Sequence, residues 1–151
     1  MQNGVDGALV RNVTTSGTYR NGMSVISAAD LLVEDCHFLD SGNTGQYNGG
    51  DTLNTRTGGT SPRAGVDLEP DDPSQDVLRN VTFRRVVASG NVDDAFAVST
   101  TTNAEVSILF DGCVATDCSG SWGSGWDVME LHAPGSVVLQ DCSTANMGGG
   151  G

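Results

Sequence analysis

The stretch that decides the fold is LLVEDCHFLDSG at residues 31–42, because variants of it recur along the chain. Each copy has an apolar strand, a pair of polar residues, a small or apolar residue and a turn. The other copies are ALVRNVTTSG (8–17), NVTFRRVVASG (80–90), ILFDGCVATDCSG (108–120) and VVLQDCSTANMG (137–148). Their alignment gives one column, with steps of 23, 50, 27 and 29 residues between Val13, Cys36, Val86, Cys113 and Cys142. A repeat of this kind governs the whole fold, so it is considered before individual elements.

A second set of short apolar segments lies between these copies. Its members are NGMSVIS (21–27), AGVDLEP (64–70), DDAFAVS (93–99) and SGWDVME (124–130). Successive side chains of a strand point to opposite faces, so alternation predicts one apolar face in each segment. That face holds the pairs Met23/Val25, Val66/Leu68, Phe96/Val98 and Trp126/Val128. The opposite face holds Ser24, Asp67, Ala97 and Asp127.

Short strands bounded by Gly, Asn, Asp and Ser turns, at about 23 to 30 residues per unit, predict an all-β parallel β-helix. An antiparallel sandwich is the alternative, but its turn signals recur every 8–12 residues. We therefore expect one β-helix domain over residues 1–151, with about five coils. Neither an amphipathic helix before the first coil nor a cap at the terminal glycines 148–151 is visible, so we expect a piece of a longer β-helix.

Composition excludes several classes of function. The chain of 151 residues has 7 Lys+Arg, all of them arginine, against 19 Asp+Glu, for a net charge of −12. Nucleic-acid binding needs clustered basic residues, so we expect no nucleic-acid partner. A membrane span needs roughly 20 apolar residues in succession, and the sequence has no such run. Chemistry that depends on lysine, such as Schiff-base formation, is excluded outright.

The 50-residue step between Cys36 and Val86 predicts a long inserted loop at about residues 39–64. Loops of this length within a compact domain tend to be functional or mobile. Tyr47, the only aromatic residue in this loop, is a candidate for stacking on a sugar ring; solvated decoration is the alternative.

The cysteines of the column, Cys36, Cys113 and Cys142, are expected to face the interior as stacked free thiols. Disulfides between adjacent coils are the alternative. Cys118 falls near a turn.

Acidic residues gather in three of the segments that the repeat places on adjacent strands. These residues are Asp67 and Glu69, Asp93 and Asp94, and Asp127 and Glu130, the last followed by His132. Residues i and i+2 of a strand share a face at roughly 6.5–7 Å, so Asp67 and Glu69 are expected side by side. Asp127 is expected two strands away from Asp67, at roughly 9–10 Å.

Paired carboxyls at such distances suit glycoside hydrolysis. An inverting enzyme needs two carboxyl groups about 6.5–9.5 Å apart, one protonated and one activating water. Crowding of like charges raises one pKa and keeps a proton in place. A solvated acidic surface and a calcium site, for which carboxylates are suitable ligands, are the two alternatives.

Arg84 and Arg85 are adjacent, so one is expected to point outward and the other inward or along a turn. An exposed arginine here suits either a contact with a sugar carboxylate or a salt bridge. Trp126 is expected to face the core, by alternation.

The segments RNGMSVISAADLLVEDCHFLDSG (20–42) and TSPRAGVDLEPDDPSQDVLRNVTFRRVVASGN (60–91) resemble the right-handed, single-stranded parallel β-helix proteins of the pectate-lyase-like superfamily. Within it, the patterns around residues 21–28 and 64–70 are similar to those of β-helical galactosidases. Asp67 and Glu69 match the acidic strand of that family, and Asp93-Asp94 resembles the paired aspartates of polygalacturonases. The Gly-His-Gly and Arg-x-Lys elements of polygalacturonases are absent.

The resemblance implies a carbohydrate-active protein, with a glycoside hydrolase favoured over a lysine-dependent lyase. We expect a polysaccharide or oligosaccharide substrate, an extracellular or periplasmic location, a monomer, and no cofactor unless calcium serves. The expected catalytic residues are Asp67, Glu69, Asp94 and Asp127, and the expected substrate-binding residues are Asp93, Glu130, His132, Arg84 and Tyr47. A non-catalytic surface, adhesin or carbohydrate-binding module and a calcium-stabilised solenoid are the alternatives.

Overall fold

A computed structural model describes residues 4–42, 59, 61–72, 74–100, 105–119, 123–129 and 135–148. Within these ranges every regular element is a β-strand, and each strand pairs with its neighbours in parallel. The expectations of an all-β chain and of parallel pairing are therefore confirmed. An antiparallel sandwich is inconsistent with this pairing.

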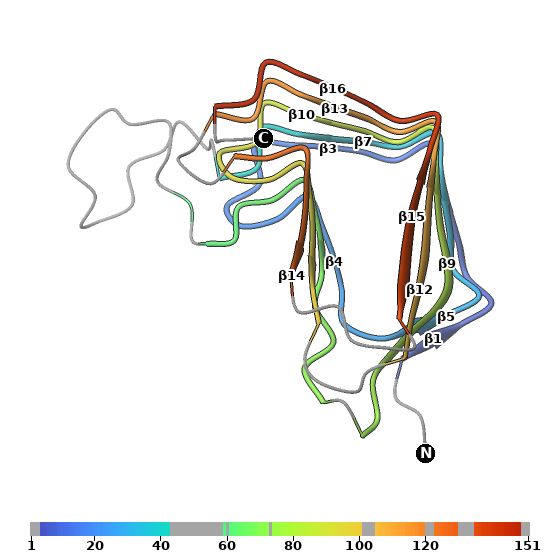
Figure 1. Cartoon of the computed structure of the whole chain (residues 1–151). Helices are drawn as coiled ribbons and strands as arrows, with labels where there is room; N and C mark the ends of the chain where they lie inside the picture. The colour runs from blue at the N-terminus through green and yellow to red at the C-terminus, as the bar shows by residue number, and fades with distance from the viewer. Residues whose placement is uncertain are drawn as a thin grey trace.

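The strands form three sheets (Figure 1). The seven-stranded sheet contains β1 (Val5–Asp6), β2 (Leu9–Arg11), β5 (Ala28–Ala29), β6 (Leu32–Glu34), β9 (Val77–Arg84), β12 (Glu105–Asp111) and β15 (Ser136–Gln140). The five-stranded sheet contains β3 (Thr14–Ser16), β7 (His37–Leu39), β10 (Val87–Ser89), β13 (Val114–Thr116) and β16 (Ser143–Ala145). The four-stranded sheet contains β4 (Met23–Val25), β8 (Val66–Leu68), β11 (Phe96–Ser99) and β14 (Trp126–Met129).

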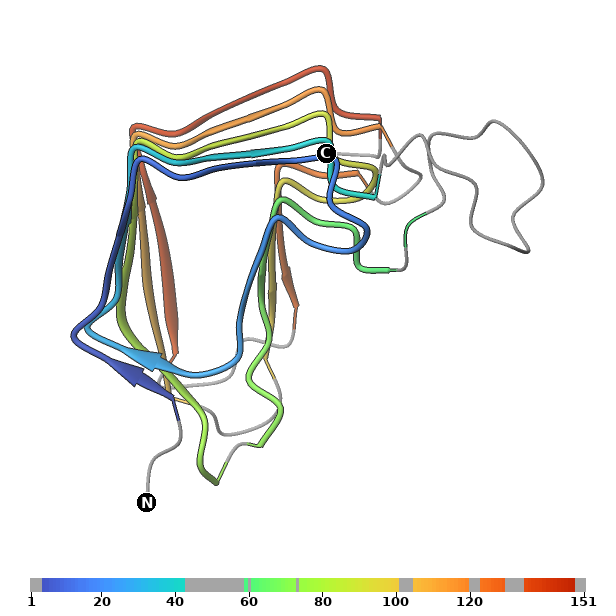
Figure 2. The same ribbon diagram turned by 180° about the vertical axis from the view of Figure 1, so that it is seen from behind.

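From β4 onward the chain visits the four-stranded, the seven-stranded and the five-stranded sheet in that order, again and again. We call one such passage a unit. Within each sheet the strands follow the order of the units, so each strand pairs with its counterparts in the units before and after it. Figures 1 and 2, from front and back, show the successive units lying over one another. This path is compatible with the parallel β-helix that the sequence predicts.

The aligned column of the repeat is confirmed by strand register. His37, Val87, Val114 and Ser143 pair with one another across the five-stranded sheet, so the residues that precede them are stacked as predicted. Cys36, Val86 and Cys113 are completely buried, whereas Val13 and Cys142 at the two ends of the column are less so. All four cysteines are free thiols.

Between strands the chain bends at residues with a positive φ, the left-handed conformation, and we call these positions left-handed corners. They explain why Asn, Asp and Gly recur at fixed places in the sequence. The residue before each member of the column has a positive φ, as in Asp35 at 53° and Arg85 at 51°. A second row of corners follows the five-stranded sheet, and a third lies in or beside the seven-stranded sheet. The three rows are Asn12, Asp35, Arg85, Gly112 and Asp141; Gly17, Asp40, Gly90, Asp117 and Asn146; and Gly7, Asp30 and Asn80. Asn, Asp and Gly tolerate this conformation best, so these residues set the bends of each unit.

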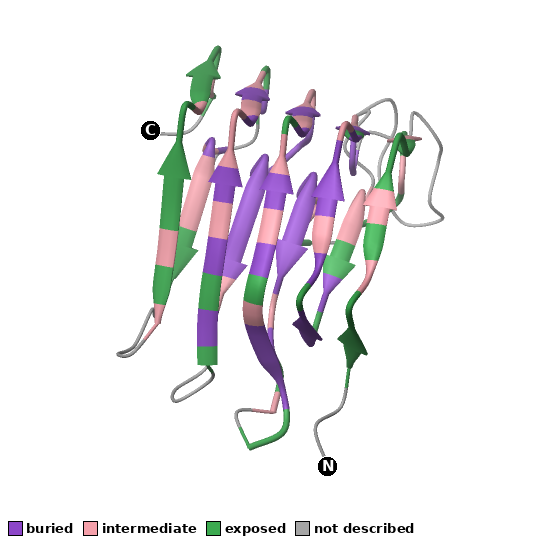
Figure 3. Ribbon diagram, turned by 90° about the vertical axis from the view of Figure 1, so that its right-hand side faces the viewer, coloured by how far each residue is buried: buried purple, intermediate pink, exposed green. Residues whose placement is uncertain are grey.

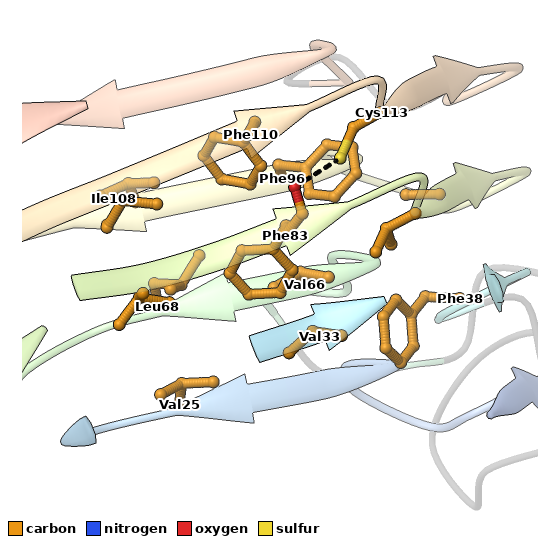
Figure 4. Close-up of a cluster of buried hydrophobic side chains, with 14 of the residues drawn as sticks. Val25, Val33, Phe38, Val66, Leu68, Phe83, Phe96, Ile108, Phe110 and Cys113 are labelled. Atoms are coloured by element: carbon orange, nitrogen blue, oxygen red, sulfur yellow. Dashed lines mark hydrogen bonds between the residues drawn. The ribbon is translucent and has the colours of Figure 1, made fainter. Parts of the chain in front are cut away.

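The interior between the sheets is filled by apolar side chains in rows. Phe83 and Phe110 stack with ring centroids 5.2 Å apart, and Phe96 meets Phe110 edge to face at 5.1 Å (Figure 4). The thiol of Cys113 donates to the carbonyl oxygen of Phe83 at 3.3 Å, shown by the dashed line in Figure 4. The interior position expected for Trp126 is confirmed by its stacking on Phe96.

Burial is greatest in the middle of the stack of units and lowest at its ends (Figure 3). The strands of the last unit, β15 and β16, are largely exposed. The inserted loop predicted at residues 39–64 falls between β7 and β8, and most of it lies outside the described residues.

Candidate functional site

The four-stranded sheet carries the acidic residues that the sequence singles out. Register places Ser24, Asp67, Ala97 and Asp127 in one row across this sheet, as alternation predicts. Their neighbours in each strand, such as Val66 and Leu68, face the core. Asp67 and Asp127 are therefore two strands apart, with Ala97 between them, at roughly 9–10 Å between Cα atoms.

Asp67 is the buried carboxyl of this row, whereas Asp127 is partly exposed. Asp67 is only 3% exposed although it faces away from the core, and its Oδ2 accepts a hydrogen bond of 2.8 Å from Nδ2 of Asn21. Desolvation, followed by the negative charge of Glu69, raises the pKa of Asp67 to about 6. The charge of Arg20 and the bond from Asn21 act in the opposite direction. Asp67 is therefore a carboxyl that retains its proton into mildly acidic solution.

Glu69 directly follows the strand that carries Asp67. Its backbone N–H donates to the carbonyl oxygen of Val25 at 3.1 Å, which extends the pairing of β8 with β4 by one residue. Glu69 is half-buried, and its charge is the largest electrostatic cause of the raised pKa of Asp67. The pair Asp67 and Glu69 thus combines a proton-retaining carboxyl with a second carboxyl on one strand.

Asp94 lies just before β11 and forms a second pair with Asp127. One oxygen of Asp94 accepts hydrogen bonds from the backbone N–H of Ser124 at 2.9 Å and from its hydroxyl at 2.7 Å. Desolvation raises the pKa of Asp94, the bonds from Ser124 lower it, and the charges of Asp127 and Asp93 raise it further. The four expected catalytic residues therefore lie in the four-stranded sheet or directly beside its strands, as two pairs: Asp67 with Glu69, and Asp94 with Asp127.

Asp93, an expected substrate contact, forms an ion pair with Arg63. Arg63 binds it through two bonds, Nε to Oδ2 at 2.9 Å and Nη2 to Oδ1 at 3.1 Å. The side chain of Asp93 is only 6% exposed in this ion pair. The arginine thus joins the segment before β8 to the segment before β11.

Arg84 lies apart from the acidic row. It ends β9 of the seven-stranded sheet and forms an ion pair with Asp111 at 3.3 Å. Its neighbour Arg85 occupies a left-handed corner and binds Asp35 and Glu34. Both arginines lie at the surface, and Arg85 lies at a turn, which was one of the two expected positions for the second arginine. Tyr47, Glu130 and His132, the other expected contacts, lie outside the described residues.

Three residues of the site were not identified from the sequence. Asn21 holds Asp67, and its Oδ1 also accepts from the backbone N–H of Ala64 at 3.2 Å. Ser124 holds Asp94, and Arg63 holds Asp93. The only signal for Asn21 and Ser124 was their place shortly before a strand in the repeated segments.

No group of three or more His, Cys, Asp or Glu side chains in the described ranges is placed to hold a metal ion. Within the same ranges, no helix is long and apolar enough to cross a membrane.

Comparison with known proteins gives no relative: no protein-family model, no curated protein and no solved structure matches this chain.

Proposed function

We propose that the chain is a right-handed, single-stranded parallel β-helix of the pectate-lyase-like superfamily. The repeated passage through three parallel sheets supports this proposal, as does the register of the column that contains Cys36 and Cys113. The left-handed corners support it too, because each unit turns at equivalent positions.

We further propose that the protein is a glycoside hydrolase that acts on a polysaccharide or oligosaccharide. The observation that carries this proposal is Asp67: a carboxyl facing away from the core, with a pKa of about 6, beside Glu69 and in one row with Asp127. Glycosidases need one carboxyl that keeps its proton and a second one that does not.

In this mechanism Asp67 is the general acid that protonates the oxygen of the leaving sugar. Glu69, at roughly 6.5–7 Å along the strand, is the first candidate for the base that activates water. Asp127, roughly 9–10 Å away across the sheet, is the second candidate. Separations near 6.5–9.5 Å leave room for a water molecule, so we expect inversion at the anomeric carbon. Asp94 is a weaker candidate, because Ser124 already donates two bonds to one of its oxygens.

Access to Asp67 sets a requirement on this mechanism. At 3% exposure, its carboxyl is reached by a sugar only after a covering group moves aside. Asn21, which donates to the carboxyl and also accepts from Ala64, is one of the groups that hold it in place.

The test is a screen of glycans and aryl glycosides, with the product anomer identified by NMR. For the substrate that is cleaved, we expect Asp67→Asn and one of the two base variants, Glu69→Gln or Asp127→Asn, to lose activity by about 100-fold or more. Asp6→Asn, the same change at an exposed carboxylate, is the control. Full activity of a folded Asp67→Asn variant contradicts the proposed mechanism.

A non-catalytic carbohydrate-binding or adhesin module is the second candidate. Asp93 is hydrogen-bonded to Arg63 and Asp94 to Ser124. This second function is favoured because these bonds give two of the acids a structural role. Glycan binding without turnover, unchanged in Asp67→Asn, would identify this function. For either function we propose an extracellular or periplasmic location.

A further inference from the structure

Asn21 and Asp94 occupy equivalent places in two units, two residues before the strands β4 and β11. Each accepts a hydrogen bond through Oδ1 from the backbone N–H of the equivalent residue in the next unit. Asn21 accepts from Ala64 at 3.2 Å, and Asp94 accepts from Ser124 at 2.9 Å. The same contact between neighbouring units therefore occurs twice along the four-stranded sheet.

This contact fixes the orientation of the Asn21 amide. A backbone N–H can only donate, so the atom of the amide that faces Ala64 is its oxygen, and the nitrogen occupies the other position. Nδ2 of Asn21 lies 2.8 Å from Oδ2 of Asp67 and 2.9 Å from Oγ of Ser24. Asn21 therefore donates to Asp67 from an orientation that a third residue determines.

The bond from Nδ2 makes the two oxygens of Asp67 different. A protonated carboxyl has one O–H that donates, and its other oxygen accepts. Since Nδ2 is a donor, Oδ2 is the accepting oxygen whenever Asp67 is protonated, and the proton lies on Oδ1. Among the described residues, no donor is bonded to Oδ1. Oδ1 is thus the oxygen from which Asp67 can pass a proton to another molecule.

The counterpart of Asn21 shows what an aspartate does in this place. Asp94 makes the same contact with the backbone of the next unit, and it differs from asparagine only in having an oxygen where the amide has Nδ2. At residue 21 such an oxygen would face Asp67, and the two carboxyls would then share one proton. Asparagine at this position keeps the proton on Asp67 itself.

We propose that Asn21 is a positioning residue for Asp67: its amide, oriented by Ala64, holds Oδ2 as an acceptor and leaves Oδ1 to donate the proton to the leaving sugar. This inference rests on the proposed glycosidase function, in which Asp67 is the general acid.

In the reaction the proton moves from Oδ1 of Asp67 to the glycosidic oxygen, while the bond between that oxygen and the anomeric carbon breaks. The electron pair of this bond stays on the leaving oxygen. Water forms the new bond to the anomeric carbon and gives a proton to the base. Asp67 is left as a carboxylate, so the bond from Asn21 becomes stronger as the reaction proceeds, because a charged acceptor binds a donor more tightly than a neutral one.

The wild-type chain tests the contact without any substrate. We expect the side-chain amide signals of Asn21 in NMR spectra to shift with the same midpoint as the carboxyl signal of Asp67, near pH 6. In Asp67→Asn, the control, the Asn21 signals should no longer shift through this range. Amide signals that do not follow the titration of Asp67 in the wild type overturn the role of Asn21.

Asn21→Asp tests the consequence for the reaction, because it keeps an oxygen toward Ala64 and replaces the donor by an acceptor. We expect the pair of carboxyls to lose its last proton at a pH about one unit or more above the wild-type midpoint, since a second negative charge lies beside Asp67. The alkaline limb of the pH profile of kcat/KM should move in the same direction.

For the substrate that the screen identifies, we expect kcat of Asn21→Asp to fall by about tenfold or more at its best pH, with KM changed by no more than about twofold. Asn12→Asp, the same substitution at an exposed corner, is the matched control and should leave the pH profile and kcat as they are. A folded Asn21→Asp variant with the pH profile and kcat of the wild type overturns the inference. Circular dichroism checks the fold, and if this variant does not fold, the wild-type titration decides.

The results separate this inference from the function on which it rests. Full activity of a folded Asp67→Asn variant overturns the proposed function, and with it the part of Asn21 in the reaction, whatever the NMR signals show. An inactive Asp67→Asn variant, together with amide signals of Asn21 that do not follow Asp67, overturns the role of Asn21 alone.

Discussion

Phe96 and Trp126 stack with ring centroids 5.0 Å apart and ring planes 10° apart, across the pairing of β11 with β14. Phe96 also contacts Phe83 and Phe110, so it joins the aromatic groups of two sheets. It is completely buried.

We expect Phe96→Ala to lower the free energy of unfolding by about 3–5 kcal/mol, because it leaves a cavity among three other rings. Urea unfolding followed by circular dichroism measures this loss. Val138→Ala, at a half-exposed apolar position, is the control and should change stability little. An equal loss in both variants would contradict the central place of Phe96 in the core.

The second prediction concerns stability and pH through Asp67. Its pKa rises from an ordinary 3.8 to about 6 on folding. Between pH 4 and 6 the folded chain keeps a proton that the unfolded chain has lost, so this group makes stability fall as pH rises through that range. Above pH 6 the folded chain holds the buried negative charge, and this lowers the free energy of unfolding by about 3 kcal/mol at most.

Asp67→Asn removes this cost, since asparagine carries no charge. We expect the variant to be more stable than the wild type at pH 8 and to show no such gain at pH 4. Unfolding in urea at pH 4, 6 and 8 measures the difference, with Asp6→Asn as the matched control. A difference that does not depend on pH would show that the pKa of Asp67 is not raised.

The third prediction concerns the left-handed corners. Asn12 is exposed and has a φ of 56°. We expect Asn12→Val to lower the free energy of unfolding by about 1–2 kcal/mol, because a β-branched residue is strained in this conformation. Asn12→Gly should be neutral within about 0.5 kcal/mol or slightly stabilising. Thermal unfolding of the two variants compares them directly. Equal stability would contradict the positive φ of residue 12.

The fourth prediction concerns the thiols. Cys36, Cys113 and Cys118 are completely buried, and desolvation raises the pKa of Cys113 to about 12 and that of Cys118 to about 11. Cys142, in the last unit, is half-buried. We therefore expect a thiol reagent to modify one cysteine quickly in the folded chain and all four in denaturant.

Mass spectrometry of the modified peptide identifies the reactive cysteine. Cys142→Ser should remove the fast reaction and Cys118→Ser should not. Rapid modification of Cys113 in the folded chain would show that the interior column is open to solvent.

Strand register was predictable from the sequence because two of its patterns determine it. Alternation shows which face of a strand each side chain occupies, and alignment of the repeats shows which residues lie beside one another. The row of Asp67, Ala97 and Asp127 and the column of Cys36, Val86 and Cys113 follow from those two patterns alone. The structure confirms both.

Partners that depend on distant segments were not predictable in this way. Arg63 and Asp93 are 30 residues apart, and Asn21 and Asp67 are 46 apart, so no local spacing connects them. The left-handed conformation of Arg85 was not predictable for a different reason: its residue type seldom adopts this conformation, unlike the Asn, Asp and Gly residues at the equivalent corners. The burial of an outward-facing carboxyl such as Asp67 likewise follows from packing rather than from pattern.

The recurring bends have an evolutionary consequence. Since equivalent bends share one backbone conformation, cutting the chain at Asp35 and rejoining it at Arg85 brings together two ends of the same geometry. Duplication or deletion of the intervening segment then changes the height of the molecule without disturbing the path on either side. We therefore expect a gene for such a chain to lengthen or shorten by whole repeats.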